Sequence, residues 1–120
     1  LELEHVEFQR NRVKIDKGEA REKLVARLEQ LSRKYGFSYN RVYIRSQKTL
    51  WGSCSHKNNI SLNVRLVELP EELSDYVIIH ELVHTRVKSH CARFWDELHR
   101  YVPDAKRVDK ELRKYRLIVA

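Results

Sequence analysis

The chain has 120 residues, a formal net charge of +7 and a pI near 9.6. This length suits one small domain over residues 1–120, and with only 3 Gly and 2 Pro the chain has few points at which a linker or repeat could begin. No apolar run approaches the length of a membrane span and no signal-type segment is visible, so we expect a soluble cytoplasmic protein. The two cysteines, Cys54 and Cys91, are predicted to be free thiols.

The first half of the chain predicts short strands around one long helix. The helix over 17–35 has an apolar stripe and ends at Gly36, a typical C-cap. Turns are expected at 10–11 and 56–59. The predicted strands are residues 4–8, 12–15, 41–45, the segment around Trp51, and 60–64. The last two should form a hairpin or adjacent strands over the helix that follows.

The second half predicts three helices. The first begins at Leu69-Pro70, with Pro at the first helical position and two acids at the positive end of the helix dipole. It is apolar on more than one face and should be buried. A second helix is expected at 90–101, and the last opens at 103–104. The stripe that should pack the last helix is Ala105, Val108, Leu112 and Tyr115.

The pentad His80-Glu81-Leu82-Val83-His84 is the most informative motif. Residues four apart lie on one face of a helix, so both imidazoles can reach a single ion at about 2.0–2.1 Å. Glu81 lies beside them as a candidate general base. Alternatively, both histidines could be core groups bonded to the backbone, with Glu81 paired to Arg86 or to a nearby lysine. Three polar groups in one buried helix favour the metal site, because without a common ligand they cost several kcal/mol, on the order of 2–7 for each unpaired group.

A catalytic zinc ion needs three protein ligands and one open position, so a third ligand must be found. His90 extends the pattern to HExxHxxxxxH and is the first choice. Glu97 is the alternative, because some zincins take a glutamate from a second helix. Lower in rank are Asp96, His99 and Cys91. In the zincin pattern a glycine turns the chain where this sequence has Val87, so we expect the turn at 88–89, with Ser89 capping the next helix.

Other blocks extend the motif into a wider resemblance. They are QKTLWGSCS (47–55), NISLN (59–63), LP (69–70), DYV (75–77), HELVH (80–84), His90 and FW (94–95). Together they resemble the YgjP-like metal-dependent hydrolases, known earlier as domain of unknown function 45 and related to the SprT-like and WLM zinc peptidases. Many relatives are longer and carry an N-terminal β-rich region, so this chain could be a fragment or a minimal version.

The resemblance implies a zincin-like α+β fold, in which a small antiparallel or mixed sheet packs on the HExxH helix. It implies one zinc ion held by His80, His84 and His90, with Glu81 catalytic. In zincins the edge strand binds an extended peptide, and residues 60–64 are the candidate edge. Candidates for the active-site wall or substrate binding are Asn63, Trp51, Arg45 and Lys48. Candidates for stabilising the oxyanion are Arg45, Lys48, His99 and Tyr101.

These features predict a zinc metallopeptidase that cleaves peptide bonds with metal-activated water. The basic composition keeps other functions open, because a positive face attracts nucleic acid or nucleotides. One alternative is a zinc-dependent nucleoside triphosphate hydrolase, although no phosphate-binding glycine loop is visible. Others are a SprT-like peptidase acting near nucleic acid and a metal-holding module without turnover, which the intact Glu81 disfavours. Expected partners are protein or peptide substrates and no membrane.

Overall fold

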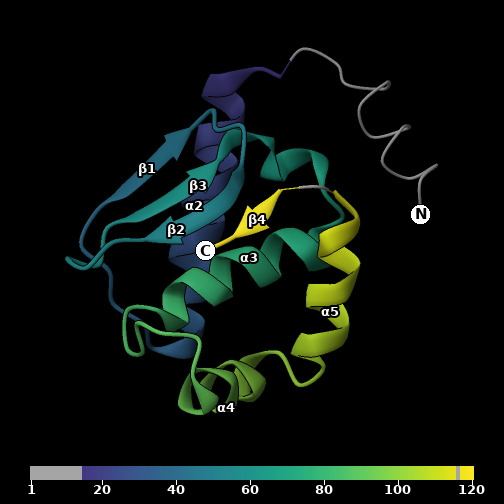
Figure 1. Cartoon of the computed structure of the whole chain (residues 1–120). Helices are drawn as coiled ribbons and strands as arrows, with labels where there is room; N and C mark the ends of the chain where they lie inside the picture. Colours follow the sequence, from purple (N-terminus) through teal and green to yellow (C-terminus); the bar gives the residue numbers. More distant parts are fainter. Residues whose placement is uncertain (1–14, 116) are drawn as a thin grey trace.

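A long helix, α2 (Lys17–Tyr35), opens the part of the chain that the computed structural model describes, residues 15–115 and 117–120 (Figure 1). The Asp16 carboxylate accepts a hydrogen bond from the Glu19 backbone N–H, and Gly36 ends the helix with φ 73°. The leucine stripe of the helix is buried at Leu24, Leu28 and Leu31. The predicted bounds of this helix are confirmed, because both of its caps are local signals.

Four strands form a mixed sheet in the order β1-β3-β2-β4. Their bounds are Val42–Arg45 for β1, Leu50–Cys54 for β2, Ile60–Asn63 for β3 and Ile118–Val119 for β4. Strands β2 and β3 are antiparallel neighbours, as predicted, whereas β1 pairs with β3 and β4 pairs with β2 in parallel.

The expectation that residues 60–64 form a free edge is wrong. Strand β3 is internal, because β1 returns beside it with Val42 opposite Ile60 and Arg45 opposite Asn63. On its other side β3 pairs with β2. Within the described residues the outer strands are β1 and β4, and β4 lies on the side of β2 opposite β3.

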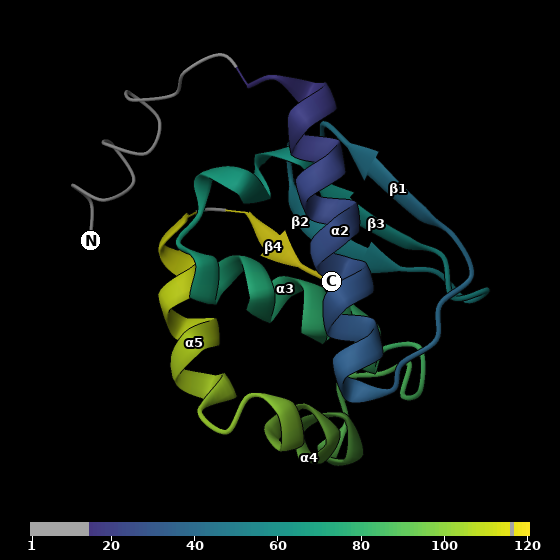
Figure 2. The same cartoon turned by 180° about the vertical axis from the view of Figure 1, so that it is seen from behind.

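Helix α3 (Glu71–Val83) is the central element of the fold and packs against α2, α4, α5 and the sheet. Figure 2 shows α2 crossing one face of the sheet, with α3 beside it. From Leu73 to Val83, all but Ser74 and Asp75 are buried, as the apolar pattern predicted. Pro70 is the N-cap instead of the first helical residue. The 3-10 helix η1 (Val64–Glu68) connects β3 to this region.

The chain ends its helical part with α4 (Ala92–Tyr101), α5 (Ala105–Leu112) and the 3-10 helix η2 (Arg113–Tyr115). Helix α4 starts slightly later than predicted, and Cys91 is its N-cap instead of Ser89. The stripe of α5 is buried at Ala105, Val108 and Leu112, which confirms its packing role, while Tyr115 is partly buried in η2.

Both cysteines are free thiols, as predicted. The strand predicted at 4–8 lies outside the described residues, as does the one at 12–15 apart from Ile15, which is in no strand. Within the described ranges, no helix is both long and apolar enough to cross a membrane.

Candidate metal centre

Three histidines converge at the C-terminal end of α3. His80 and His84 lie one helical turn apart, and His90 returns from the segment before α4. One nitrogen from each ring lies within 4.8 Å of the others, and the Nε2 atoms of His84 and His90 are 3.1 Å apart. Two ligands of a tetrahedral zinc ion, each about 2.0–2.1 Å from the metal, would be about 3.3 Å apart. The spacing of the pair therefore fits one shared ion.

Burial of His80 gives the clearest sign that a ligand belongs here. The residue is 2% exposed, and neither ring nitrogen has a hydrogen-bond partner among the described residues. Burial, followed by the nearby His84 and His90, lowers the pKa of His80 well below its ordinary value. The ring is therefore held neutral, which is the form that binds a metal. A cation shared with the other two histidines would satisfy one of the two unpaired nitrogens.

The orientation of the His84 ring also favours metal binding. Its Nδ1 lies 2.9 Å from the Val87 carbonyl oxygen, which fixes Nδ1 as the donor and leaves Nε2 as an acceptor facing His90. Burial lowers the pKa of this ring as well. The Phe94 ring from α4 packs against all three imidazoles, with centroid distances of 4.8, 4.4 and 5.0 Å to His80, His84 and His90. The site thus has an apolar wall that holds the rings in place.

Glu81 is fully buried, and neither of its carboxylate oxygens has a hydrogen-bond partner in the described chain. Burial raises the pKa of this carboxyl well above its ordinary value. A group with a strongly perturbed pKa beside potential metal ligands is typical of a catalytic acid or base.

Gly52 is a residue whose contribution the sequence left undefined. A Cβ atom at this position would lie 3.2 Å from Glu81 Cγ, 3.1 Å from Val77 Cγ1 and 3.3 Å from the Ser61 carbonyl oxygen. The glycine therefore lets β2 approach α3 closely at the level of Glu81. A glycine inside a strand is the sequence signal for such an approach.

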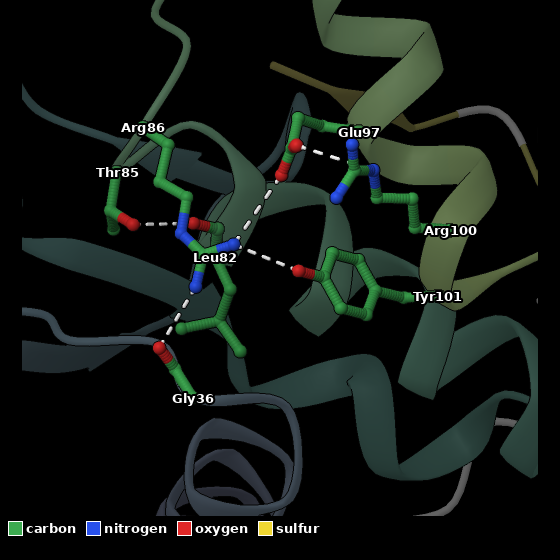
Figure 3. A network of polar contacts seen from close by, with 7 residues as sticks. All are labelled: Gly36, Leu82, Thr85, Arg86, Glu97, Arg100 and Tyr101. Atoms are coloured by element: carbon green, nitrogen blue, oxygen red, sulfur yellow. Dashed lines mark hydrogen bonds and ion pairs between the residues drawn. The ribbon is translucent and has the colours of Figure 1, made fainter.

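Glu97, the alternative third ligand, is not in the group of residues with metal-ligand spacing. Its carboxylate binds Arg86 at 3.3 Å and Arg100 at 3.5 Å (Figure 3). His99 is also engaged elsewhere, with Nδ1 2.7 Å from the Trp95 carbonyl oxygen. Among the described residues, the cluster with metal-ligand spacing consists of the three histidines and includes neither Asp96 nor Cys91, which are both exposed.

The predicted wall residues have structural contacts. Trp51 is fully buried in the core. The Asn63 side chain donates to the carbonyls of Gln47 and Leu50 and accepts from the Arg65 backbone N–H. These contacts favour scaffold support, one of the two roles that the sequence left open for Trp51 and Asn63.

The candidates for oxyanion stabilisation and substrate binding differ in their surroundings. The Arg45 guanidinium lies 4.8 Å over the Tyr43 ring, with Nε 3.4 Å from Ser61 Oγ. The Tyr101 hydroxyl accepts a hydrogen bond from Arg86. Lys48 is exposed. A direct role for Arg45, Lys48, His99 or Tyr101 in catalysis stays a prediction.

The outer side of β2 is covered by the last residues of the chain. Ile118 N–H donates to the Thr49 carbonyl at 2.8 Å, and Ala120 N–H donates to the Gly52 carbonyl at 3.1 Å. A backbone hydrogen bond at Ala120 also raises the pKa of His84, against the larger lowering caused by burial. Residues 118–120 therefore lie along β2 on the side opposite β3.

A buried HExxH helix beneath a small mixed sheet, with a third histidine facing the pair, defines a zincin-like metal-dependent hydrolase. The chain belongs to the YgjP-like metallopeptidase domain family, whose model matches residues 3–115. It is accordingly a peptide-hydrolysing enzyme of the metallopeptidase class.

Two solved structures support this assignment. The metallopeptidase zymogen abylysin of Pyrococcus abyssi is 28% identical with a TM-score of 0.69, and the match covers 81% of this chain and 99% of that one. The metallopeptidase zymogen jannalysin of Methanocaldococcus jannaschii is 25% identical with a TM-score of 0.55, over 84% and 97% of the two chains. No curated protein sequence matches the chain.

Proposed function

We propose that this chain is a zinc peptidase in which His80, His84 and His90 hold the ion and Glu81 is the general base. The observation that carries the proposal is the group of buried, unpartnered polar atoms at His80 and Glu81 beside a pair of facing imidazole nitrogens. Such groups are costly in an apolar interior unless a ligand satisfies them. Neutral imidazoles in a three-histidine set suit zinc and leave a fourth position open.

The chemistry divides between the ion and the chain. A bound zinc ion would supply positive charge and Lewis acidity, which lower the pKa of nearby water and polarise the peptide carbonyl. Glu81 takes a proton from the attacking water through a carboxylate oxygen and returns it to the leaving amine. Glu81 is buried, which shields its carboxylate from bulk water. Because Gly52 has no side chain, β2 can lie close against the Glu81 side chain and confine it.

The nucleotide-hydrolase alternative has less support. Basic residues around α5 would have to bind phosphates, yet several are engaged within the chain. Arg107 pairs with Asp104 and Glu72, and Arg113 pairs with Asp109. The Lys106 ammonium lies 4.6 Å from the centroid of the Trp95 ring. These contacts favour a solvated, internally paired helix face over a phosphate site.

We also propose that residues 117–120 keep the enzyme latent. They pair with the outer side of β2, where an extended substrate would add as a strand. Ile118 is 63% exposed, whereas its neighbours Leu117 and Val119 pack against the hydrophobic core. Displacing the segment would therefore break the backbone hydrogen bonds of Ile118 and Ala120 and uncover those two side chains. Both solved relatives are described as zymogens, which agrees with a covered site.

The first test measures the zinc content of the purified wild-type chain beside the His90→Ala and Glu97→Ala variants. We expect about one zinc ion per chain in wild type and in Glu97→Ala, with loss in His90→Ala. Activity on an unstructured protein and on nucleoside triphosphates then decides between peptidase and nucleotide hydrolase. Zinc retained by His90→Ala and lost from Glu97→Ala would overturn the proposed ligand set.

The latency proposal is tested at Ile118. Ile118→Pro removes the N–H that donates to Thr49 and should raise peptidase activity, because the β2 edge becomes accessible. Ile118→Ser keeps that N–H and is the matched control, with activity close to wild type. Equal activity in Ile118→Pro and wild type would show that the segment does not restrict the site.

A further inference from the structure

Arg86 connects three separate parts of the fold from a position between the second and third histidines. Its Nη2 donates to the Gly36 carbonyl at 2.8 Å, and its Nη1 donates to the Tyr101 hydroxyl at 2.8 Å and to Glu97 Oε2 at 3.3 Å (Figure 3). The guanidinium also lies 4.1 Å over the Phe37 ring. One side chain thus joins the turn after α3 to the end of α2 and to α4.

The acceptors of Arg86 are themselves held in place. Glu97 is only 19% exposed on its side chain and is also paired with Arg100. The Tyr101 ring packs against Tyr35 and Phe37, with centroid distances of 5.0 and 4.9 Å. Because the planar guanidinium offers several donors in fixed directions, it can bind a carboxylate, a hydroxyl and a carbonyl at once. A lysine could not reproduce this arrangement.

The turn that Arg86 anchors contains no glycine and carries the third histidine. Its first part is fixed to α3, since Thr85 Oγ1 donates to the Leu82 carbonyl at 2.6 Å (Figure 3) and Val87 N–H donates to the Val83 carbonyl at 3.0 Å. Two side-chain hydrogen bonds from this turn to α4 come from Arg86, one to Glu97 Oε2 and one to the Tyr101 hydroxyl. These polar contacts of Arg86 add to the packing of α4 on α3, in which the buried Phe94 ring lies against His80 and His84.

The placement of α4 matters because His90 is exposed and has little else to hold it. Its Nε2 lies 3.1 Å from His84 Nε2, and its ring packs against those of His80, His84 and Phe94. Phe94 belongs to α4 and touches all three imidazoles. A shift of α4 would move the wall against which His90 rests, while His80 and His84 would stay on α3.

We infer, on the basis of the proposed zinc site, that Arg86 is a positioning residue that holds His90 ready to complete the metal site. It touches neither the ion nor the substrate, and acts through the turn, Glu97, Tyr101 and α4. Without it, the third ligand must be ordered when the metal binds, and that ordering weakens the binding. Loss of a residue that orients a metal ligand typically costs about 10–100-fold in metal affinity.

The test measures the zinc Kd of the full chain by competition with a chromogenic chelator. Arg86→Gln should raise the Kd about 10–100-fold, and Tyr101→Phe should raise it less, because it removes one of the three acceptors. Arg107→Gln is the matched control. Arg107 also joins two acids from different segments, Glu72 and Asp104, but on the other side of the fold at the N-terminal end of α3. Its loss should leave the Kd unchanged.

A double-mutant comparison separates positioning from general destabilisation. If Arg86 acts through His90, Arg86→Gln should add little to the Kd of the His90→Ala chain. The inference is overturned if Arg86→Gln leaves the zinc Kd at the wild-type value, or if it raises the Kd equally in both backgrounds. Failure of the proposed zinc site would look different, because wild type itself would then bind no stoichiometric zinc or His90→Ala would bind it as tightly.

Discussion

Gly52→Ala tests how closely the sheet must approach the catalytic helix. The new methyl group would lie 3.1 Å from Val77 Cγ1, 3.2 Å from Glu81 Cγ and 3.3 Å from the Ser61 carbonyl oxygen. Ordinary contacts between such atoms are several tenths of an ångström longer, so β2 and α3 must separate. Val77 and Glu81 are fully buried, and Ser61 is paired with β2. Overpacking of this kind costs about 1–3 kcal/mol of folding stability.

The same displacement should reduce turnover. Moving the Glu81 carboxylate by a few tenths of an ångström displaces the proposed general base, and a displacement approaching about 1 Å can cost about 10²-fold in rate. We therefore expect Gly52→Ala to be about tenfold less active, or worse, while it retains zinc, because none of the three proposed ligands contacts the new methyl group.

The assay is urea unfolding of the metal-free chain, together with peptidase rates of the zinc-loaded enzyme. Gly18→Ala is the control. A Cβ at that helical position meets only Asp16 Oδ1 at 3.4 Å, so this variant should be as stable as wild type or gain up to about 1 kcal/mol. A Gly52→Ala chain with wild-type stability and activity would refute the idea that glycine is required for this approach.

Three further predictions concern buried polar groups. The pKa of Glu81 is raised by burial, so the folded state keeps its proton longer than the unfolded state, and rising pH above 4.5 removes stability from the metal-free chain. Between this value and the raised pKa of the folded state, the unfolding free energy of Glu81→Gln should therefore increase relative to that of wild type by up to about 1.4 kcal/mol per pH unit. Urea unfolding at several pH values measures this difference, and a difference that does not change with pH contradicts the buried carboxyl. Asn63→Ala loses three hydrogen bonds to Gln47, Leu50 and Arg65 and should cost about 2–3 kcal/mol with an unchanged KM, whereas a raised KM with wild-type stability would indicate substrate contact. Tyr76→Phe removes the 2.8 Å bond to buried Asp109 and should cost about 1–2 kcal/mol in thermal unfolding, with zinc content unchanged; a variant as stable as wild type would show that this bond contributes nothing.

The sequence predicted best those features that depend on neighbouring residues. The long helix α2 has an acidic N-cap, a leucine stripe and a terminal glycine, all of which act within one or two turns. The HExxH spacing places His80 and His84 on one helical face whatever surrounds the helix. The HExxHxxxxxH spacing made His90 the first choice for the third ligand, the family resemblance agreed with it, and the structure brings it to within 3.1 Å of His84.

What the tertiary structure decided was which distant segments meet. The edge predicted at 60–64 is internal, since β1 and β2 come to lie on either side of β3. Glu97 has the chemistry and approximate spacing of a zinc ligand, but Arg86 and Arg100 hold its carboxylate away from the histidines. Helical periodicity and capping are short-range properties that a sequence displays directly. Strand order, the close approach at Gly52 and the ion pairs of Arg86 depend on contacts between residues far apart in the chain, and those contacts exist only once the chain has folded.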